Sequence, residues 1–167
     1  FYNIYSYSVR NLGTPVFPKA LFGNLLSEFG DLCKILTVWH NNRRIAGVMT
    51  FFFKGQVMPY YGGALKECFS LSVNDFMYWE LLCYGLANGF KVFDFGRSKK
   101  GTGSYKFKEH WGFSPEPLEY QYYLAEGTAI PNISPSNPKF SVAISIWKRL
   151  PLLLTKCLGP PLTRYFP

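Results

Sequence analysis

The sequence predicts an α/β protein in which helices flank a mixed, mostly antiparallel sheet. Three observations predict this class: two amphipathic helical patterns open the chain, three strand-like segments joined by short turns follow, and a long helical pattern then leads into a short apolar strand. With 48% apolar and 19% aromatic residues, the 167-residue chain can build one domain with a substantial core. This composition excludes a disordered chain, and no apolar run approaches the roughly eighteen residues of a membrane span.

Two helices are expected at the start. Residues 1–12 repeat apolar side chains at helical spacing until Gly13, and Pro18 is placed to begin a second helix that Gly30 ends. Each helix therefore has one apolar stripe. The first stripe contains Phe1, Ile4, Tyr5, Ser8 and Leu12, and the second contains Leu21, Phe22, Leu25, Leu26 and Phe29.

Three strands are expected next, at residues 35–40, 44–53 and 57–63. Asn41-Asn42 joins the first two, and Lys54-Gly55-Gln56 joins the last two. Asn and Gly tolerate a positive φ, so both joints predict tight hairpin turns. The three strands therefore form an antiparallel meander.

A long central helix follows the meander. Asn74 is a good N-cap and Gly89 is placed to end the helix. The helix leads directly into the short apolar strand KVFDFG at residues 91–96, as in the second half of a crossover unit. Its apolar stripe contains Phe76, Trp79, Cys83, Leu86 and Phe90.

The remaining residues predict a short helix, one more strand and a helical tail. Residues 104–111 can form the short helix, and the alternation in LEYQYYLA at 118–125 indicates the strand. Three prolines make 127–138 a surface connection, after which helices are expected at 138–149 and 151–158. We therefore expect one domain at residues 1–126 and a proline-rich connection with a helical tail at residues 127–167.

The order of these elements is that of the GNAT acyltransferase fold, and four stretches resemble the FemAB-like acyltransferases associated with exopolysaccharide and exosortase systems. They are LGTPVFPKALF, NDFMYWELL, FDFGRSKKGTGSYKFKEHWG and NPKFSVAISIWKRLP. The third is the most specific, because Tyr105, Phe107-Lys108 and Trp111-Gly112 follow its Asp-Phe-Gly-Arg loop at the family's spacing. The resemblance implies transfer of an aminoacyl or acyl group to an amine of a cell-envelope or exopolysaccharide precursor.

The resemblance also implies a partner and a range of donors. Such proteins pair two GNAT-like domains, so this chain is expected to be the second domain and an N-terminal GNAT-like domain its partner. GNAT enzymes that use acetyl-CoA resemble one another in a glycine-rich loop before the central helix, which residues 62–75 do not match. We therefore expect no bound cofactor, and the donor stays open between aminoacyl-tRNA and an acyl-CoA or acyl carrier.

The positive charge of the chain indicates an anionic partner. The net charge is +8, and five of the 18 basic residues fall within the twelve positions 97–108, beside glycines. A phosphate-bearing precursor, a tRNA or a membrane surface would suit this charge. The five residues are Arg97, Lys99, Lys100, Lys106 and Lys108.

Lys108 and Arg97 are the expected electrostatic clamp on the substrate. When an amine attacks an ester or thioester, the oxyanion that forms needs nearby donors. The Lys108 ammonium would hold the acyl carbonyl or a phosphate, and the alternative is a solvated lysine at a helix end. Arg97 would grip a phosphate or carboxylate with two parallel hydrogen bonds, or form a salt bridge to Asp94.

Two carboxylates are candidates for the general base that accepts the proton of the amine. Asp94 lies in an otherwise apolar strand, so we expect it to be paired, either as the base or more readily as a structural partner. Glu80 borders the stripe of the central helix and is either the base or a helix-surface residue. The remaining substrate-binding candidates are Tyr61, Gly103, Tyr105, Lys106 and Trp111.

Other features set the expected environment. The four cysteines are scattered, so we expect no metal site and a cytoplasmic protein. The tail at residues 148–167 mixes leucines with four basic residues, which favours either contact with the inner face of an anionic membrane or packing on the N-terminal domain. The alternative function is a non-catalytic domain that binds an anionic glycan precursor or completes its partner domain.

Overall fold

A computed structural model describes residues 1–130 and 138–164, and it divides the chain into two compact units. The first unit comprises Phe1–Asp94 with Val142–Pro167, and the second comprises Phe95–Ser141. The first unit contains the sheet and the helices that cover it. The domain boundary predicted at residues 126 and 127 stays a prediction.

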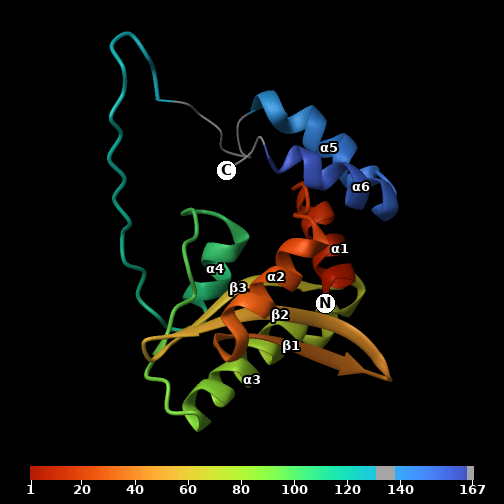
Figure 1. The fold of residues 1–167 in the computed structure, drawn as a ribbon, viewed down its shortest axis with the longest axis vertical. Coiled ribbons are helices and arrows are strands. Elements are labelled where there is room, and N and C mark those ends of the chain that lie inside the picture. Colours follow the sequence, from red (N-terminus) through yellow and green to blue (C-terminus); the bar gives the residue numbers. More distant parts are fainter. Residues whose placement is uncertain (131–137, 165–167) are drawn as a thin grey trace. The chain divides into compact units, whose positions relative to one another are not determined.

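A curled four-stranded sheet forms the centre of the first unit (Figure 1). Its strands β1 (Cys33–His40), β2 (Arg43–Phe53) and β3 (Gln56–Ala64) form the predicted antiparallel meander. Strand β4 (Val92–Phe93) lies parallel to β3 at the edge. The predicted α/β class with a mixed, mostly antiparallel sheet is therefore confirmed.

Both hairpin turns of the meander use left-handed residues, as the sequence predicted. Asn41 and Asn42 have φ values of 47° and 59°, and Lys54 and Gly55 have values of 46° and 76°. Two successive positive φ values give the twist that connects antiparallel strands through a two-residue loop. The turns set the register next to each loop, and a β-bulge shifts it farther along each strand pair.

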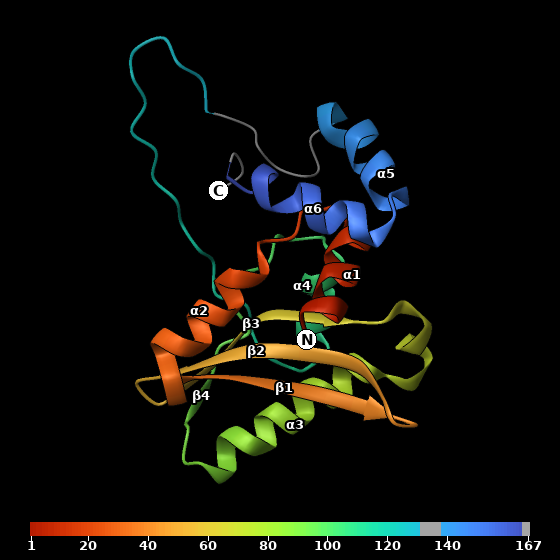
Figure 2. The same cartoon turned by 45° about the vertical axis from the view of Figure 1, so that its right-hand side comes forward.

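Helices cover both faces of the sheet. Helices α1 (Tyr2–Leu12) and α2 (Lys19–Phe29) lie on one face and α3 (Val73–Ala87) lies on the other (Figures 1 and 2). Short 3₁₀ helices, Gly30–Leu32 (η1) and Lys66–Leu71 (η2), connect them to the strands. One core cluster includes Tyr5, Phe22 and Met49, and the other includes Val48, Phe52, Met77 and Leu81.

The inward face of α3 differs from the predicted one. The structure buries Val73, Met77, Leu81 and Gly85, which follow one another at intervals of four residues. By contrast, the predicted stripe leaves Phe76, Trp79 and Leu86 at 51%, 57% and 73% exposure. The helix is apolar around most of its circumference, so periodicity alone could not choose between its faces. Leu12 of α1 was likewise expected in a stripe and is exposed.

The ends of α3 agree with the prediction only in part. The helix begins at Val73, so Ser72 rather than Asn74 is the N-cap, and its φ is positive. At the other end Gly89 adopts a φ of 77°, and the Phe90 amide donates to the Gly85 carbonyl. Gly89 therefore ends the helix as predicted.

The strand predicted at residues 118–125 is wrong. These residues form neither helix nor strand, and their large side chains are exposed, with Tyr123 fully so. Alternation of apolar and polar residues indicates a strand only where another strand supplies backbone partners. Within the described residues, no strand pairs with this segment.

The tail helices belong to the first unit. Helix α5 (Ser141–Arg149) follows a 3₁₀ turn at Pro138–Phe140, and α6 (Leu152–Leu162) packs against α1 (Figure 2). Helix α6 continues beyond its predicted end at residue 158, because Gly159 is helical and packed inward instead of acting as a cap. No helix in the described ranges is long and apolar enough to cross a membrane.

Candidate functional site

The candidate site residues fall in both units, and each group is described within its own unit. Tyr61, Glu80 and Asp94 belong to the first unit. The second unit holds the cationic segment, which runs from residue 97 to residue 108 and includes all but the last residue of helix α4 (Gly103–Glu109). The second unit contains Arg97, Gly103, Tyr105, Lys106, Lys108 and Trp111.

Thr102 starts α4 and closes the loop in front of it. Its Oγ1 accepts a hydrogen bond from the Tyr105 amide at 3.3 Å and donates to the Lys99 carbonyl at 2.7 Å. Gly101 precedes it with a φ of 79°, a conformation that glycine adopts without strain. The cap and the glycine together fold the basic loop back onto its own helix.

Lys108 ties this loop to α4. Its Nζ donates to the Gly96 carbonyl at 2.8 Å and to the Arg97 carbonyl at 3.3 Å. The side chain is half-buried, so it is not the solvated lysine of the alternative interpretation. Both contacts are to backbone oxygens, so the Lys108 ammonium stabilises the backbone conformation of Gly96 and Arg97.

Arg97 lies on the surface of the second unit. Its guanidinium Nη1 donates to the hydroxyl of Tyr120 at 3.4 Å, which is a long contact. A small ring cluster supports the chain on either side of the loop. In this cluster the ring of Phe95 packs at a tilt against Trp111 and Phe113, and Phe107 meets Trp111 edge-on.

The other predicted residues of this unit have different surroundings. Trp111 belongs to the ring cluster and is half-buried, whereas Lys106 and Gly103 are exposed. Tyr105 is half-buried, and burial together with the carboxylate of Glu109 raises the pKa of its phenol. Among these four residues, Lys106 is the charged one, and its side chain is exposed to solvent.

In the first unit, strands β3 and β4 separate at a proline. The Val57 carbonyl accepts the Asp94 amide at 2.9 Å, so the backbone groups of Val57 face β4. The backbone N–H and C=O groups of successive residues in a strand point to opposite edges, so those of residue 59 face β4 as those of Val57 do. Residue 59 is a proline, which has no N–H to donate to β4. The pairing of the two strands accordingly stops after two residues.

A β-bulge lies beside this separation. Met49 pairs with Tyr61 and Thr50 pairs with Pro59, so Tyr60 is the additional residue of β3. Bulges re-aim side chains and are frequent next to active sites. Tyr60 is 65% exposed and borders an apolar groove of about 420 Å³ that Phe29 and Phe51 also line.

Tyr61 lines the same groove and is partly buried, and its role in substrate binding stays a prediction. Its ring packs against those of Tyr5, Phe17 and Phe22 beneath α1 and α2, with centroids 5.2 to 6.1 Å apart. Burial raises the pKa of its phenol, and Tyr60 adds to the effect. Its neighbour Tyr60, the additional residue of the bulge, is the more exposed of the two tyrosines.

The two candidate bases are both exposed. Strand β4 ends at Phe93, so Asp94 lies beyond it and is not buried, contrary to the premise that an apolar strand surrounds it. Glu80 is exposed on α3, one residue away from the exposed ring of Trp79. Because both carboxylates are exposed, burial does not require either of them to have a partner.

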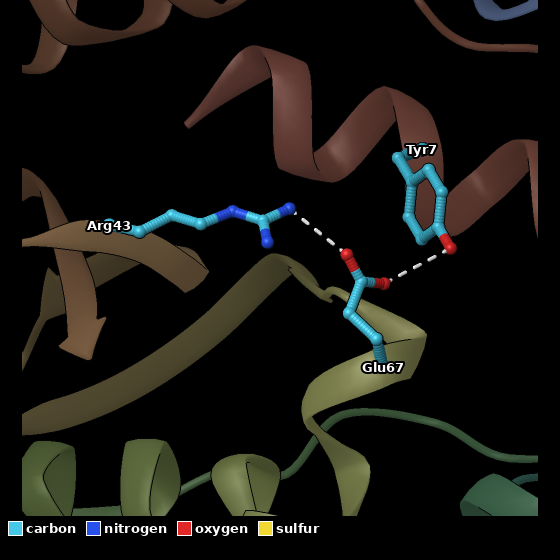
Figure 3. A network of polar contacts seen from close by, with 3 residues as sticks. All are labelled: Tyr7, Arg43 and Glu67. Carbon is cyan, nitrogen blue, oxygen red and sulfur yellow. Dashed lines mark hydrogen bonds and ion pairs between the residues drawn. The ribbon is translucent and has the colours of Figure 1, made fainter. Parts of the chain in front are cut away.

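A polar network that the sequence did not indicate connects three elements of the first unit (Figure 3). Glu67 of η2 forms an ion pair with Arg43 at 3.0 Å and accepts a hydrogen bond from the Tyr7 hydroxyl at 3.3 Å. Its own backbone amide and Arg43 lower the pKa of the Glu67 carboxyl. The network lies on the surface and connects η2 with β2 and α1.

The sequence matches the family described as acetyltransferase (GNAT) domain over residues 2–109. This match spans more than half of the chain, so the chain belongs to the GNAT family of acyltransferases. It includes Asp94, Arg97 and Lys108, whereas Trp111 lies beyond it. No curated protein gives a significant match to the sequence. Within the described ranges, no three His, Cys, Asp or Glu side chains gather closely enough to hold a metal ion.

Proposed function

We propose that this GNAT-family chain is FemAB-like and transfers an aminoacyl or acyl group to an amine of a cell-envelope or exopolysaccharide precursor. The observation that carries the proposal is the cationic segment at residues 97–108, where five basic residues share one loop and one short helix. A cap, a left-handed glycine and the Lys108 contacts organise this segment. Such a surface suits a phosphate-bearing substrate.

Arg97 is the proposed substrate clamp, and Lys108 is a positioning residue. The Arg97 guanidinium would bind a phosphate of the precursor through two parallel hydrogen bonds. Lys108 would act through the loop, because its ammonium holds the Gly96 and Arg97 carbonyls. This role replaces direct contact of Lys108 with the acyl carbonyl as the favoured hypothesis.

The chemistry is the attack of a neutral amine on an activated carbonyl. A C–N amide bond forms, and the C–O bond of an aminoacyl ester or the C–S bond of a thioester breaks. The proton of the amine passes to a base and then to the leaving oxygen or sulfur. Asp94 is the favoured base over Glu80, because it lies only three residues before Arg97 in the chain.

The proposed donor is an aminoacyl-tRNA, with an acyl-CoA or acyl carrier as the other candidate. The 3₁₀ helix η2, tied to Arg43 through Glu67, occupies the stretch where a glycine-rich phosphate loop would be needed for acetyl-CoA. The apolar groove beside Tyr60 would suit the uncharged part of a substrate.

The proposed protein partner is an N-terminal GNAT-like domain. The outer side of α3 exposes Phe76, Trp79 and Leu86, which is unusual for a helix that faces only water. The four cysteines are free, which suits the reducing cytoplasm.

The alternative function is a non-catalytic domain that binds an anionic glycan precursor. The structural use of the Lys108 ammonium favours it, because that group makes backbone contacts instead of facing an acyl carbonyl. Both functions require the cationic segment to bind an anion, but only the first produces an amide.

A transfer assay separates the two functions. The chain is incubated with an aminoacyl-tRNA or acetyl-CoA and with a UDP-linked precursor that carries a free amine, and the amide product is detected by mass spectrometry. We expect product from the wild type, a loss of about tenfold or more in Arg97→Ala, and no change in Lys54→Ala, an exposed cation of the first unit. Precursor binding without product with either donor would favour the non-catalytic function.

A further inference from the structure

Helix α6 packs against the protein through small side chains. Thr155 and Gly159 are its buried residues. A Cβ atom at Gly159 would lie 2.7 Å from the Val16 carbonyl oxygen, so the helix backbone is in direct contact with the chain there. Next to them, Lys156 Nζ donates to Asn3 Oδ1 at 2.6 Å. The inner face of α6 is therefore fully engaged with α1 and the loop that follows it.

Four of the five leucines of α6 are exposed. Leu153 is 77% exposed, and Leu154, Leu158 and Leu162 are exposed as well. This polarity is the reverse of a helix that faces water, in which apolar residues pack inward and polar residues point outward. Helix α5 adds the exposed side chains of Val142 and Ile146. An apolar surface of this kind on a helix that is already docked indicates a further binding partner.

The charge of the same region is entirely positive. Residues 127–167 contain five basic residues and no Asp or Glu. Lys148 and Arg149 are exposed at the end of α5, immediately before α6 begins. Leucines combined with lysines and arginines, without acidic residues, are typical of helices that lie on anionic bilayers.

We propose that α6 and the end of α5 form a docking site for an anionic membrane surface. The outward leucines would enter the boundary between headgroups and acyl chains, while Lys148 and Arg149 meet lipid phosphates. Helix α6 has 11 residues, so it lies in the membrane plane and does not cross the bilayer. The site is independent of acyl transfer and needs no residue of the cationic segment.

The charge distribution favours lipid over a second copy of this chain. A second copy would bring the same positive, acid-free surface to the contact, and like charges would oppose the pairing. An anionic bilayer supplies both an apolar interior and the opposite charge. Binding should therefore weaken as the salt concentration rises, because the leucine contribution stays while the charge contribution is screened.

Co-sedimentation of the whole chain with vesicles tests the proposal. One set of vesicles contains phosphatidylcholine alone, and the other contains equal amounts of phosphatidylcholine and phosphatidylglycerol. We expect binding to the second set, at least about tenfold weaker binding in Leu154→Gln/Leu158→Gln, and partial loss in Lys148→Gln/Arg149→Gln. The matched control is Leu71→Gln/Leu86→Gln, which changes two exposed leucines outside the tail and should bind like the wild type.

Circular dichroism and thermal unfolding confirm that each variant folds, which the exposure of the substituted residues leads us to expect. The proposal is overturned if the wild type sediments with neither set of vesicles, or if the tail and control variants lose binding equally. It is also overturned if sedimentation velocity shows a dimer that Leu154→Gln/Leu158→Gln dissociates while vesicles bind no protein. In that case the leucines pair two copies of the chain.

Discussion

The first unit and the second unit are each stabilised internally by a different kind of interaction. The first unit buries Met49 and Met77 almost completely, at 0% and 1% exposure, between its sheet and its helices. In the second unit no described residue, in 95–130 or 138–141, is buried. Side-chain hydrogen bonds and a few ring contacts hold that unit instead.

This difference suggests that the first unit provides most of the free energy of unfolding, whereas the second unit carries the proposed ligand-binding residues. Apolar burial is the dominant favourable contribution to folding, so the free energy of unfolding should reside mainly in the first unit. The second unit contains the densest group of basic side chains, on a loop with little packing around it. Binding residues are often found on such loops, which a rigid scaffold carries. Substitutions in the two units should therefore have different consequences.

The largest expected effect on stability comes from the buried face of α3. Met77→Ala should lower the free energy of unfolding by about 2–5 kcal/mol, because it leaves a cavity in the core. Trp79→Ala, two residues away on the exposed side, should lower it by less than about 1 kcal/mol. Urea unfolding measures both. A larger loss in Trp79→Ala would mean that the helix buries the face predicted from the sequence.

Helix α3 shows what the sequence could and could not predict. Its existence, its end at Gly89 and the meander before it followed from periodicity and turn residues, which are local signals. The buried face did not follow, because both sides of the helix are apolar and the choice depends on what packs against it. Strand 118–125 failed for a related reason: its alternation is local, but a strand requires a partner from elsewhere.

The candidate site was predictable to a similar degree. Composition pointed to the cationic segment, and Thr102 and Gly101 fold it into a compact loop. The carbonyl contacts of Lys108, the exposure of Asp94 and the bulge at Tyr60 depend on backbone geometry that no residue pattern encodes. The sequence therefore indicates where basic side chains gather, the contacts of each residue follow only from the structure, and the site itself stays a prediction.

The next effect concerns the close contact between α6 and the loop before α2. Gly159→Ala should destabilise the first unit by about 1–3 kcal/mol, because the added Cβ would meet the Val16 backbone. Gly23→Ala in α2 is the matched control, since apart from the neighbouring residues and backbone of its own helix no atom lies within 4 Å of its Cβ position. It should be neutral or stabilise the protein by up to about 1 kcal/mol. Thermal unfolding distinguishes the two, and equal effects would contradict the packing of α6.

A smaller, local effect is expected in the second unit. Lys108→Met keeps the length of the side chain but removes its hydrogen bonds to the Gly96 and Arg97 carbonyls. Hydrogen exchange should become about five- to tenfold faster at the amides of residues 97–100, while the melting temperature hardly changes. Lys106→Met, an exposed lysine of the same helix, should leave exchange unaltered. A fall in melting temperature like that of Met77→Ala would show that the two units are not separable in stability.

The smallest effect is the pH dependence that Glu67 contributes. The folded protein lowers the pKa of Glu67, so it binds a proton there less readily than the unfolded chain does. The stabilisation is therefore complete above the unfolded pKa of about 4.3 and disappears as the pH falls through the folded value. The difference in melting temperature between the wild type and Glu67→Gln should be present at neutral pH and vanish in acid. A difference that grows in acid would contradict the network of Figure 3.

The most direct test of the proposed division between stability and binding is calorimetric titration of a UDP-linked amino-sugar precursor into three forms of the chain. These forms are the wild type, Arg97→Ala in the cationic segment, and Arg43→Ala, an exposed arginine of the first unit. We predict binding to the wild type, an affinity about ten- to a hundredfold lower in Arg97→Ala, and unchanged affinity in Arg43→Ala. Equal affinity in the wild type and Arg97→Ala, or no binding by the wild type, would contradict the account.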